Sequence, residues 1–285
     1  MTISFYTPRT QNGIKAQAEK LALAEAIPHM KSLELAAQAA GFKNWRQAQK
    51  LLPVSMPLVQ ISVNWHDSKS RHRGTETISY PFPKAVVEML PSMFAGYRVR
   101  DGVRMLAKSQ ADNQWKARHW ACMVLRKIMF IEATGLKPSK AYRKAFPTER
   151  QSYHGAVYYD RLEMPGLDHE SVWFDPATRA YVIGNEPYTG SVKDNSEVAV
   201  RQAQWCEQYG YAMLQPTWSG IYNPEGGTRL SLLAKVGNGI DLSALVAKIN
   251  QFPDDFGPEN WPGGSETISY KELHRELSSR ATIPF

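Results

Sequence analysis

Apolar residues recur every three or four positions near the N-terminus, a spacing that predicts short amphipathic helices. The predicted helices cover residues 13–26, 31–40 and 45–52. Gly41 is placed to end the second helix. Asn44 is placed to cap the third helix, and Pro53 is placed to end that third helix. The three helices predict a helix-turn-helix-like module over 13–53, preceded by a polar and poorly ordered stretch over 1–12.

After this module the pattern changes to alternation of apolar and polar residues, which is typical of strands with one buried face. Two hairpins are predicted, one from 58–65 and 75–82 and one from 171–175 and 180–186. Further strands are expected within 211–218 and 229–236. Helical spacing returns over 84–90, 104–134, 139–146, 194–209, 241–251 and 271–280. The fold class is therefore α+β, with the three-helix module followed by a larger domain over 58–285 of antiparallel hairpins packed with helices.

One short sequence occurs twice. Residues 74–80 read Gly-Thr-Glu-Thr-Ile-Ser-Tyr, and residues 264–270 differ from them only by Ser in place of Thr. Two related strand–helix units would produce this repeat. Because nothing around it repeats, chance or selection for a good strand sequence is the preferred explanation.

The composition is that of a soluble globular protein. Of 285 residues, 43% are hydrophobic and 21% are charged, so the chain can bury a sizeable core. No run of 18 apolar residues and no apolar leader segment is present, and we expect a cytoplasmic protein of bacterial type. The two cysteines, Cys122 and Cys206, cannot form a disulfide framework or a four-ligand zinc site.

Charge is distributed unevenly along the chain. Residues 1–150 hold 24 Lys and Arg against 10 Asp and Glu, a formal charge of +14, whereas residues 151–285 hold 10 against 17, a formal charge of −7. A strongly basic half suggests a polyanionic partner such as nucleic acid. Attraction between the two halves, or a merely solvated basic face, would explain the same numbers.

The third predicted helix and the residues before it carry polar side chains that suit DNA. These residues are Lys43, Asn44, Arg46, Gln47 and Lys50. Lys and Arg would contact phosphates, and Asn and Gln can hydrogen-bond to adenine. Any compact three-helix module also needs a turn glycine and a polar outer face, so a purely structural interpretation stays open.

This part of the chain also resembles a known module. The pattern consists of Ile27-Pro28-His29, an apolar helix from Leu33 to Gly41, then Phe42 and Trp45. It resembles the front of an uncharacterised bacterial family, a domain of unknown function often carried on mobile elements. A similar module precedes glyoxalase-related proteins. The resemblance implies no activity, and the metal-binding His and Glu set that a glyoxalase needs is not found in this sequence.

Two further groups of residues are candidates for function. Lys69, Arg71 and Arg73 lie in the basic loop of the first hairpin and could grip phosphates, although such loops are also simply soluble. The polar segment 154–175 contains His154, Asp160, Asp168, His169 and Glu170, which could bind a divalent metal and activate water. Their spacing matches no closed metal motif.

No phosphate-binding, dinucleotide-binding or serine-nucleophile motif is present, so no cofactor is expected. The sequence therefore favours a non-enzymatic nucleic-acid-binding accessory or regulatory protein of bacterial mobile DNA, with a possible protein partner for its acidic half. The alternatives are a metal-dependent, nuclease-like hydrolase that uses the 154–175 segment, and a protein-interaction module that binds no nucleic acid.

Overall fold

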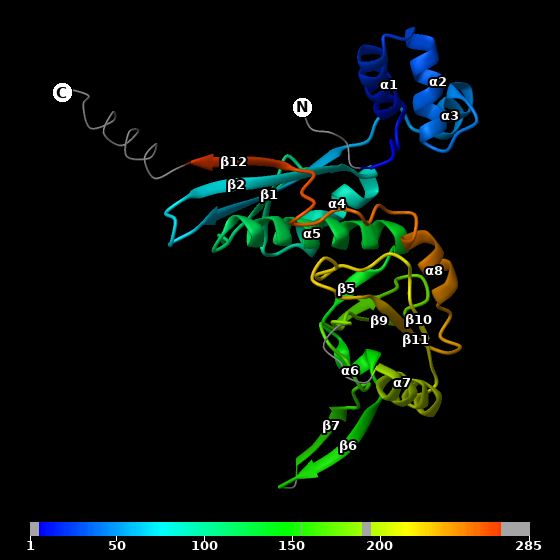
Figure 1. Cartoon of the computed structure of the whole chain (residues 1–285). Coiled ribbons are helices and arrows are strands. Elements are labelled where there is room, and N and C mark those ends of the chain that lie inside the picture. Colours follow the sequence, from blue (N-terminus) through cyan, green and yellow to red (C-terminus); the bar gives the residue numbers. More distant parts are fainter. Residues whose placement is uncertain (1–5, 155, 190–194, 269–285) are drawn as a thin grey trace, which may run out of the picture. The chain divides into compact units, whose positions relative to one another are not determined.

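A computed structural model describes residues 6–154, 156–189 and 195–268 (Figure 1). The chain forms two compact units: unit 1 contains Met1–Asp112 and Pro262–Phe285, and unit 2 contains Asn113–Trp261. The chain thus leaves unit 1 once and returns to it near the C-terminus. The stretch 58–285, expected to form one domain, contributes to both units.

The three N-terminal helices are present as predicted. They are α1 (Gln11–Glu25), α2 (His29–Ala39) and α3 (Trp45–Leu51). Thr10 is buried and its side chain caps α1, so this helix begins two residues earlier than expected. Gly41 adopts a left-handed backbone, and Asn44 caps α3. The helices enclose a small core of Ile14, Ala18, Leu33, Ala36, Ala37, Trp45 and Ala48.

The rest of unit 1 is a five-stranded sheet in the order β12-β2-β1-β4-β3. Its elements are β1 (Leu58–His66), β2 (Arg73–Pro81), α4 (Lys84–Met93), β3 (Tyr97–Arg100), β4 (Arg104–Ala107) and β12 (Gly264–Ile268). The β1–β2 hairpin confirms the predicted one. Only β1 and β4 are parallel. Val59, Ile61 and Val63 of β1 are buried on one face, and the alternating residues form an outer face.

The repeated sequence pairs with itself in this sheet. Strand β12, which holds the second copy, lies antiparallel to β2, which holds the first, with Thr75 opposite Glu266 and Glu76 opposite Ser265. A Cβ atom on Gly74 would lie only 2.0 Å from the carbonyl oxygen of Glu266. Glycine at this position therefore permits the close approach of β12. Ser269 and Tyr270 of the second copy lie outside the described residues.

Unit 2 is built on an antiparallel sheet in the order β10-β11-β9-β8-β5. Its elements are α5 (Gln114–Thr134), β5 (Lys137–Ser139), α6 (Tyr142–Ala145), β8 (Ser171–Phe174), β9 (Tyr181–Asn185), α7 (Asn195–Tyr209), β10 (Tyr211–Leu214), β11 (Ser231–Lys235) and α8 (Leu242–Ile249). The β8–β9 hairpin confirms the predicted one, and α8, which Asp241 caps, lies within the helix expected over 241–251.

Helices cover both faces of this sheet. On one face Val172, Ile183 and Leu233 pack in a cluster that includes Trp205 of α7. On the other face Trp173 contacts Phe130 of α5, with ring centroids 4.4 Å apart. Because both faces are covered, the central strands β9 and β11 are buried along most of their length instead of alternating.

A two-stranded ribbon, β6 (Thr148–Tyr153) and β7 (Ala156–Arg161), extends from the rest of unit 2 (Figure 1). Nearly all of its described side chains are exposed on both faces. The sequence did not predict this hairpin, because an exposed ribbon needs no alternation of apolar and polar residues.

Two predicted helices are wrong in extent. Residues 104–107 form β4 rather than the start of the long helix, which begins at Gln114 with Asn113 as its cap. Met105 and Ala107 alternate into the core of unit 1, so strand pairing overrides the helical spacing. The helix expected over 139–146 is shortened to Tyr142–Ala145, because Lys137–Ser139 pairs with β8. The helix expected over 271–280 lies outside the described residues.

Across the ranges that the structure describes, no helix combines the length and apolar character needed to cross a bilayer.

Candidate nucleic-acid interface

The formal charge of the protein belongs to unit 1. Its residues hold 18 Lys and Arg against 11 Asp and Glu, a formal charge of +7, whereas unit 2 holds 16 of each. The division seen along the sequence at residue 150 is therefore not a division of the fold. The basic residues of 113–150 fold together with the acidic residues of 151–261 in unit 2, where the charges cancel.

Three arginines lie together at one side of the outer face of the unit 1 sheet. Arg98 and Arg100 project from β3, and Arg104 of β4 is directly opposite Arg100. All three side chains are exposed, and the register places them on the same face as Gln60 of β1. Arg104 approaches Asp101 at 3.6 Å, while Arg98 and Arg100 form no ion pair with any residue that the structure describes. We call this group the arginine corner.

The outer face beside the arginine corner carries short polar side chains. The hydroxyl groups of Ser62 and Thr77 are 2.9 Å apart, and the Thr75 hydroxyl donates to Asn64 Oδ1 at 2.8 Å. Hydrogen bonds across the strands fix these side chains close to the backbone. The side chains at these positions are thus short and polar, and Leu106 of β4 lies between Ser62 and Arg98 on the same face.

The predicted basic loop forms the tip of the β1–β2 hairpin. The Asp67 carboxylate accepts from the backbone N–H groups of Lys69 and Ser70 and from the Ser70 hydroxyl. These hydrogen bonds, led by the Ser70 hydroxyl, lower the pKa of Asp67. The Asp67 carboxylate therefore orders the loop. The side chains of Lys69, Arg71 and Arg73 are exposed.

Polar residues on and before α3 have two different roles. Asn44 Oδ1 accepts from the Gln47 backbone N–H at 2.8 Å, and Gln47 Oε1 accepts from the Lys43 backbone N–H at 2.6 Å. Both amide oxygens are thus engaged in capping the helix, which removes one of the two groups that bidentate contact with adenine needs. The Lys43, Arg46 and Lys50 side chains are exposed and stay candidates for phosphate contact.

The residues suggested for catalysis lie in two separate places of unit 2. His154 is in the turn of the β6–β7 ribbon, and Asp160 lies opposite Glu149 on the same ribbon. Asp168, His169 and Glu170 precede β8, and Glu170 accepts from Arg161 at 3.0 Å. Among the described residues, no group of three or more His, Cys, Asp or Glu side chains could hold a metal ion.

His169 instead joins a cluster of rings that the sequence did not reveal. Its imidazole stacks on Tyr222 at 3.8 Å and meets the edge of Tyr188 at 5.5 Å. Tyr222 also meets the edge of His119, which stacks on Trp115 of α5. We call these five residues the ring cluster. No sequence signal could have found it, because its members come from four distant segments.

The loop that carries Tyr222 is held by two carboxylates, of which Glu186 is buried and Asp254 is half-buried. Glu186 is 2% exposed and accepts from the backbone N–H groups of Ile221 and Tyr222 at 2.6 and 2.8 Å. Asp254 accepts from the backbone and hydroxyl of Ser219 and from Arg126. Burial raises the pKa of Glu186 to about 7, against the lowering effect of its hydrogen bonds.

Protonation in the ring cluster is also shifted by the fold. Burial lowers the pKa of His119, so its imidazole is favoured in the neutral form, with the opposing influence of Glu225. His169 has a positive φ of 45°, a strained backbone for a residue other than glycine. Imidazole and phenol groups can exchange protons. The carboxylates of Asp168, Glu186 and Glu225 lie around the ring cluster, so the cluster is not a basic surface.

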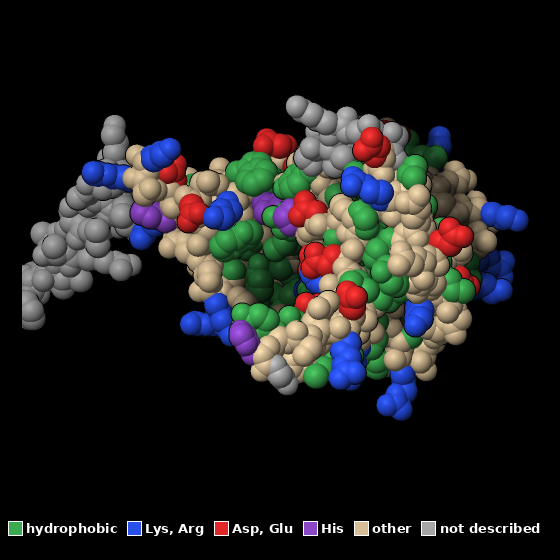
Figure 2. All heavy atoms as spheres, turned by 90° about the horizontal axis from the view of Figure 1, so that it is seen from below, with side chains coloured by type: hydrophobic (Ala, Val, Ile, Leu, Met, Phe, Trp, Pro, Cys, Tyr) green, Lys and Arg blue, Asp and Glu red, His purple; other side chains and the backbone are tan. Residues whose placement is uncertain are grey.

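In Figure 2 several basic side chains gather at the left end of the view, and over the rest of the face shown basic and acidic side chains are interspersed. Comparison with known protein families, curated proteins and solved structures gave no match to this chain. The assignment of function thus depends on the chain's own residues.

Proposed function

We propose that this protein is a nucleic-acid-binding accessory or regulatory protein, without catalytic activity of its own, that contacts nucleic acid through unit 1. The observation that carries the proposal is the assignment of the whole formal charge of +7 to unit 1. A polyanion gains electrostatic energy only where positive charge is in excess, because nearby carboxylates otherwise cancel it.

The contact surface comprises the arginine corner, the tip of the β1–β2 hairpin and the lysines and arginine at α3. Guanidinium groups bind phosphate in a bidentate manner, and Arg98 and Arg100 are available for this. The short polar side chains of the outer face allow a sugar–phosphate backbone to lie close to the sheet. The setting in bacterial mobile DNA is part of this proposal and rests on the resemblance carried by the pattern from Ile27 to Trp45.

The proposal is tested by fluorescence anisotropy with a labelled 20-base-pair duplex over a series of salt concentrations. Replacement of Arg98, Arg100 and Arg104 by alanine should weaken binding and reduce the salt slope of log K by about 1 for each phosphate that is no longer neutralised. The matched control replaces the exposed Lys140, Arg143 and Lys144 of unit 2, which removes the same charge. Equal reductions of affinity in both variants, or no binding by the native protein at low salt, would refute the proposal.

A protein partner for unit 2 is a second candidate, favoured by the exposed β6–β7 ribbon. Its large apolar side chains, Tyr153, Val157, Tyr158 and Tyr159, are all exposed, and isolated two-stranded hairpins are marginally stable in water. A photo-crosslinker at Val157 (50% exposed) should capture one defined protein in cells, and a crosslinker at Val200 (56% exposed, on α7) should not. Identical products from both positions would count against a docking role of the ribbon.

A further inference from the structure

We infer that the nucleic acid bound by unit 1 is double-stranded RNA, and that hydroxyl and amide groups on the outer face of the sheet contact its 2′-hydroxyl groups. The inference concerns the surface of the proposed function and rests on that proposal. The groups belong to neighbouring outer-face positions of β1 and β2. We call them the hydroxyl–amide patch: Ser62, Asn64, Thr75 and Thr77.

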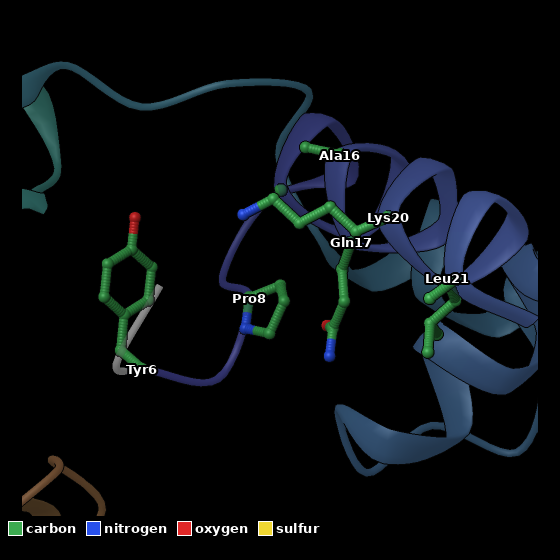
Figure 3. A pocket seen from close by; sticks show the side chains of 8 residues that line it. Tyr6, Pro8, Ala16, Gln17, Lys20 and Leu21 are labelled. Carbon is green, nitrogen blue, oxygen red and sulfur yellow. The ribbon is translucent and has the colours of Figure 1, made fainter. Parts of the chain in front are cut away.

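The outer face, as far as the structure describes it, carries no phenyl, phenol or indole ring on which an unpaired base could stack. The aromatic strand residues Trp65, Tyr80 and Tyr97 all lie at inner-face positions. Trp65 and Tyr80 are buried, and Tyr97 is directly opposite the buried Ala107. Tyr6, at the cavity beside α1 (Figure 3), packs on Tyr80 with ring centroids 4.6 Å apart. Because proteins bind single strands by stacking bases on aromatic rings, a duplex is the better fit.

The outer face is wider than the grooves of B-form DNA. Five strands lie side by side in the order β12-β2-β1-β4-β3, and neighbouring strands are about 4.8 Å apart, so the face spans about 19 Å. The major and minor grooves of B-form DNA are about 12 and 6 Å wide, and both are about 8 Å deep. The short side chains of the hydroxyl–amide patch therefore cannot reach base edges at the floor of either groove. They can contact only groups at the surface of a duplex.

Double-stranded RNA has suitable groups at its surface. Its minor groove is wide and shallow and displays the 2′-hydroxyl groups, each of which can donate and accept a hydrogen bond. The hydroxyl groups of Ser62 and Thr77 share one hydrogen bond of 2.9 Å, so one of their two hydrogens is left for a ligand. Asn64 accepts from Thr75 through Oδ1 at 2.8 Å, which leaves its side-chain N–H groups to donate. DNA lacks the 2′-hydroxyl groups that these donors would contact.

Positive charge at both ends of the hydroxyl–amide patch suits the phosphates that border such a groove. At one end, Gln60 of β1 is beside Arg104 of the arginine corner. At the other end, His66 is opposite the exposed Arg73. At a rise of about 3.3 Å per residue, Gln60 and His66 are about 20 Å apart along β1. A phosphate strand can therefore be held at each end while the sugars lie over the patch.

Two other side chains on this face make the two ends unequal. Leu106 of β4, between Ser62 and Arg98, offers only van der Waals contact to a duplex. Glu266 of β12 is opposite Thr75, where its carboxylate repels phosphate. The arginine corner therefore holds phosphate more strongly than the end of the patch near β12.

The test compares one duplex sequence made as RNA, as 2′-O-methyl RNA and as DNA. Each is titrated with the full chain by fluorescence anisotropy at the same low salt concentration. RNA should bind about tenfold more tightly than DNA, the gain expected for one or two hydrogen bonds between neutral groups. The 2′-O-methyl duplex keeps the shape of RNA but has no hydroxyl hydrogen, and it should lose this gain. Single-stranded RNA should bind more weakly than the RNA duplex.

A double variant, Ser62→Ala with Thr77→Val, removes two hydroxyl groups with little change of shape. It should lower the affinity for RNA to that for DNA and leave the affinity for DNA unchanged, with circular dichroism to verify the fold. Thr267→Val is the matched control, since Thr267 is exposed on the opposite face of the sheet, and it should retain the preference for RNA.

The outcomes separate this inference from the proposed function. Equal affinities of the native protein for RNA and DNA, undiminished binding of the 2′-O-methyl duplex, or tighter binding of single-stranded RNA would overturn the inference and leave the proposed function in place. A preference for RNA that survives the double substitution would do the same. Failure of every duplex to bind would refute the proposed function itself.

Discussion

The carboxylate of Glu76 accepts a hydrogen bond from the hydroxyl of Ser265, a residue 189 positions later in the chain, at 2.5 Å. Glu76 is fully buried on β2, and its other oxygen accepts from the Trp65 indole at 3.2 Å. The returning strand β12 thus contributes a polar group to a buried site. This hydrogen bond ties the last described strand to the sheet in unit 1.

Removal of the Ser265 hydroxyl should therefore destabilise unit 1. Ser265→Ala leaves a buried carboxylate with one partner fewer, at a cost of about 1–3 kcal/mol in the free energy of unfolding. Thr267→Ala is the control, since Thr267 is an exposed residue on the same strand. Urea denaturation measures both variants, and equal stabilities would show that Ser265 does not stabilise the Glu76 site.

Alanine at position 74 should detach β12 from the sheet. The new Cβ would overlap the carbonyl oxygen of Glu266, a backbone atom that cannot rotate away. Hydrogen exchange should accelerate in residues 264–268 and change little in β1, because only the edge strand is displaced. Gly96→Ala is the matched control, since nothing that the structure describes lies within 4 Å of a Cβ there. Unchanged protection of β12 in Gly74→Ala would contradict this account.

The elements that the sequence predicted correctly are those with a strong local signal. Asn44 caps α3 as predicted, and the alternation of Val59, Ile61 and Val63 identified β1. Each of these features depends on neighbours within a few residues. The same logic failed for Arg104–Ala107, where pairing with β1 and β3 decides the structure.

The site was less predictable than the fold. The basic loop and α3 could be found because their residues are adjacent in sequence. The arginine corner requires the register that places Arg100 opposite Arg104, and the ring cluster joins segments as far apart as Trp115 and Tyr222. The charge split at residue 150 was real along the sequence but did not match the fold, because α5 belongs to unit 2.

Stability should fall as the pH rises from about 4.5 to about 7 because of Glu186. Its pKa is raised to about 7 in the folded state from an ordinary value of 4.5, so the folded state binds the proton more tightly. Between these values the folded state holds more protons than the unfolded state, and raising the pH therefore favours unfolding. Glu186→Gln keeps an oxygen that can accept from Ile221 and Tyr222 and removes the charge.

Chemical denaturation at pH 5 and pH 8 measures this effect. The decrease in stability between the two values should be smaller in Glu186→Gln than in the native protein. The control Glu197→Gln changes an exposed glutamate on α7 and should retain the native pH dependence. If the stability of Glu186→Gln fell as far as that of the native protein, Glu186 would not be the group that titrates.

The last prediction separates two roles of Asn44, a helix cap and a reader of DNA bases. As a cap, its oxygen satisfies the backbone N–H of Gln47, and Asn44→Ala should lower the free energy of unfolding by about 1 kcal/mol. Asn44→Ser keeps a capping oxygen but cannot form a bidentate contact with adenine. If capping is its only role, Asn44→Ser retains both native stability and native affinity for duplex DNA in the anisotropy assay. A weaker affinity in Asn44→Ser at unchanged stability would instead identify Asn44 as a base contact, and the amide would have to leave its cap when DNA binds.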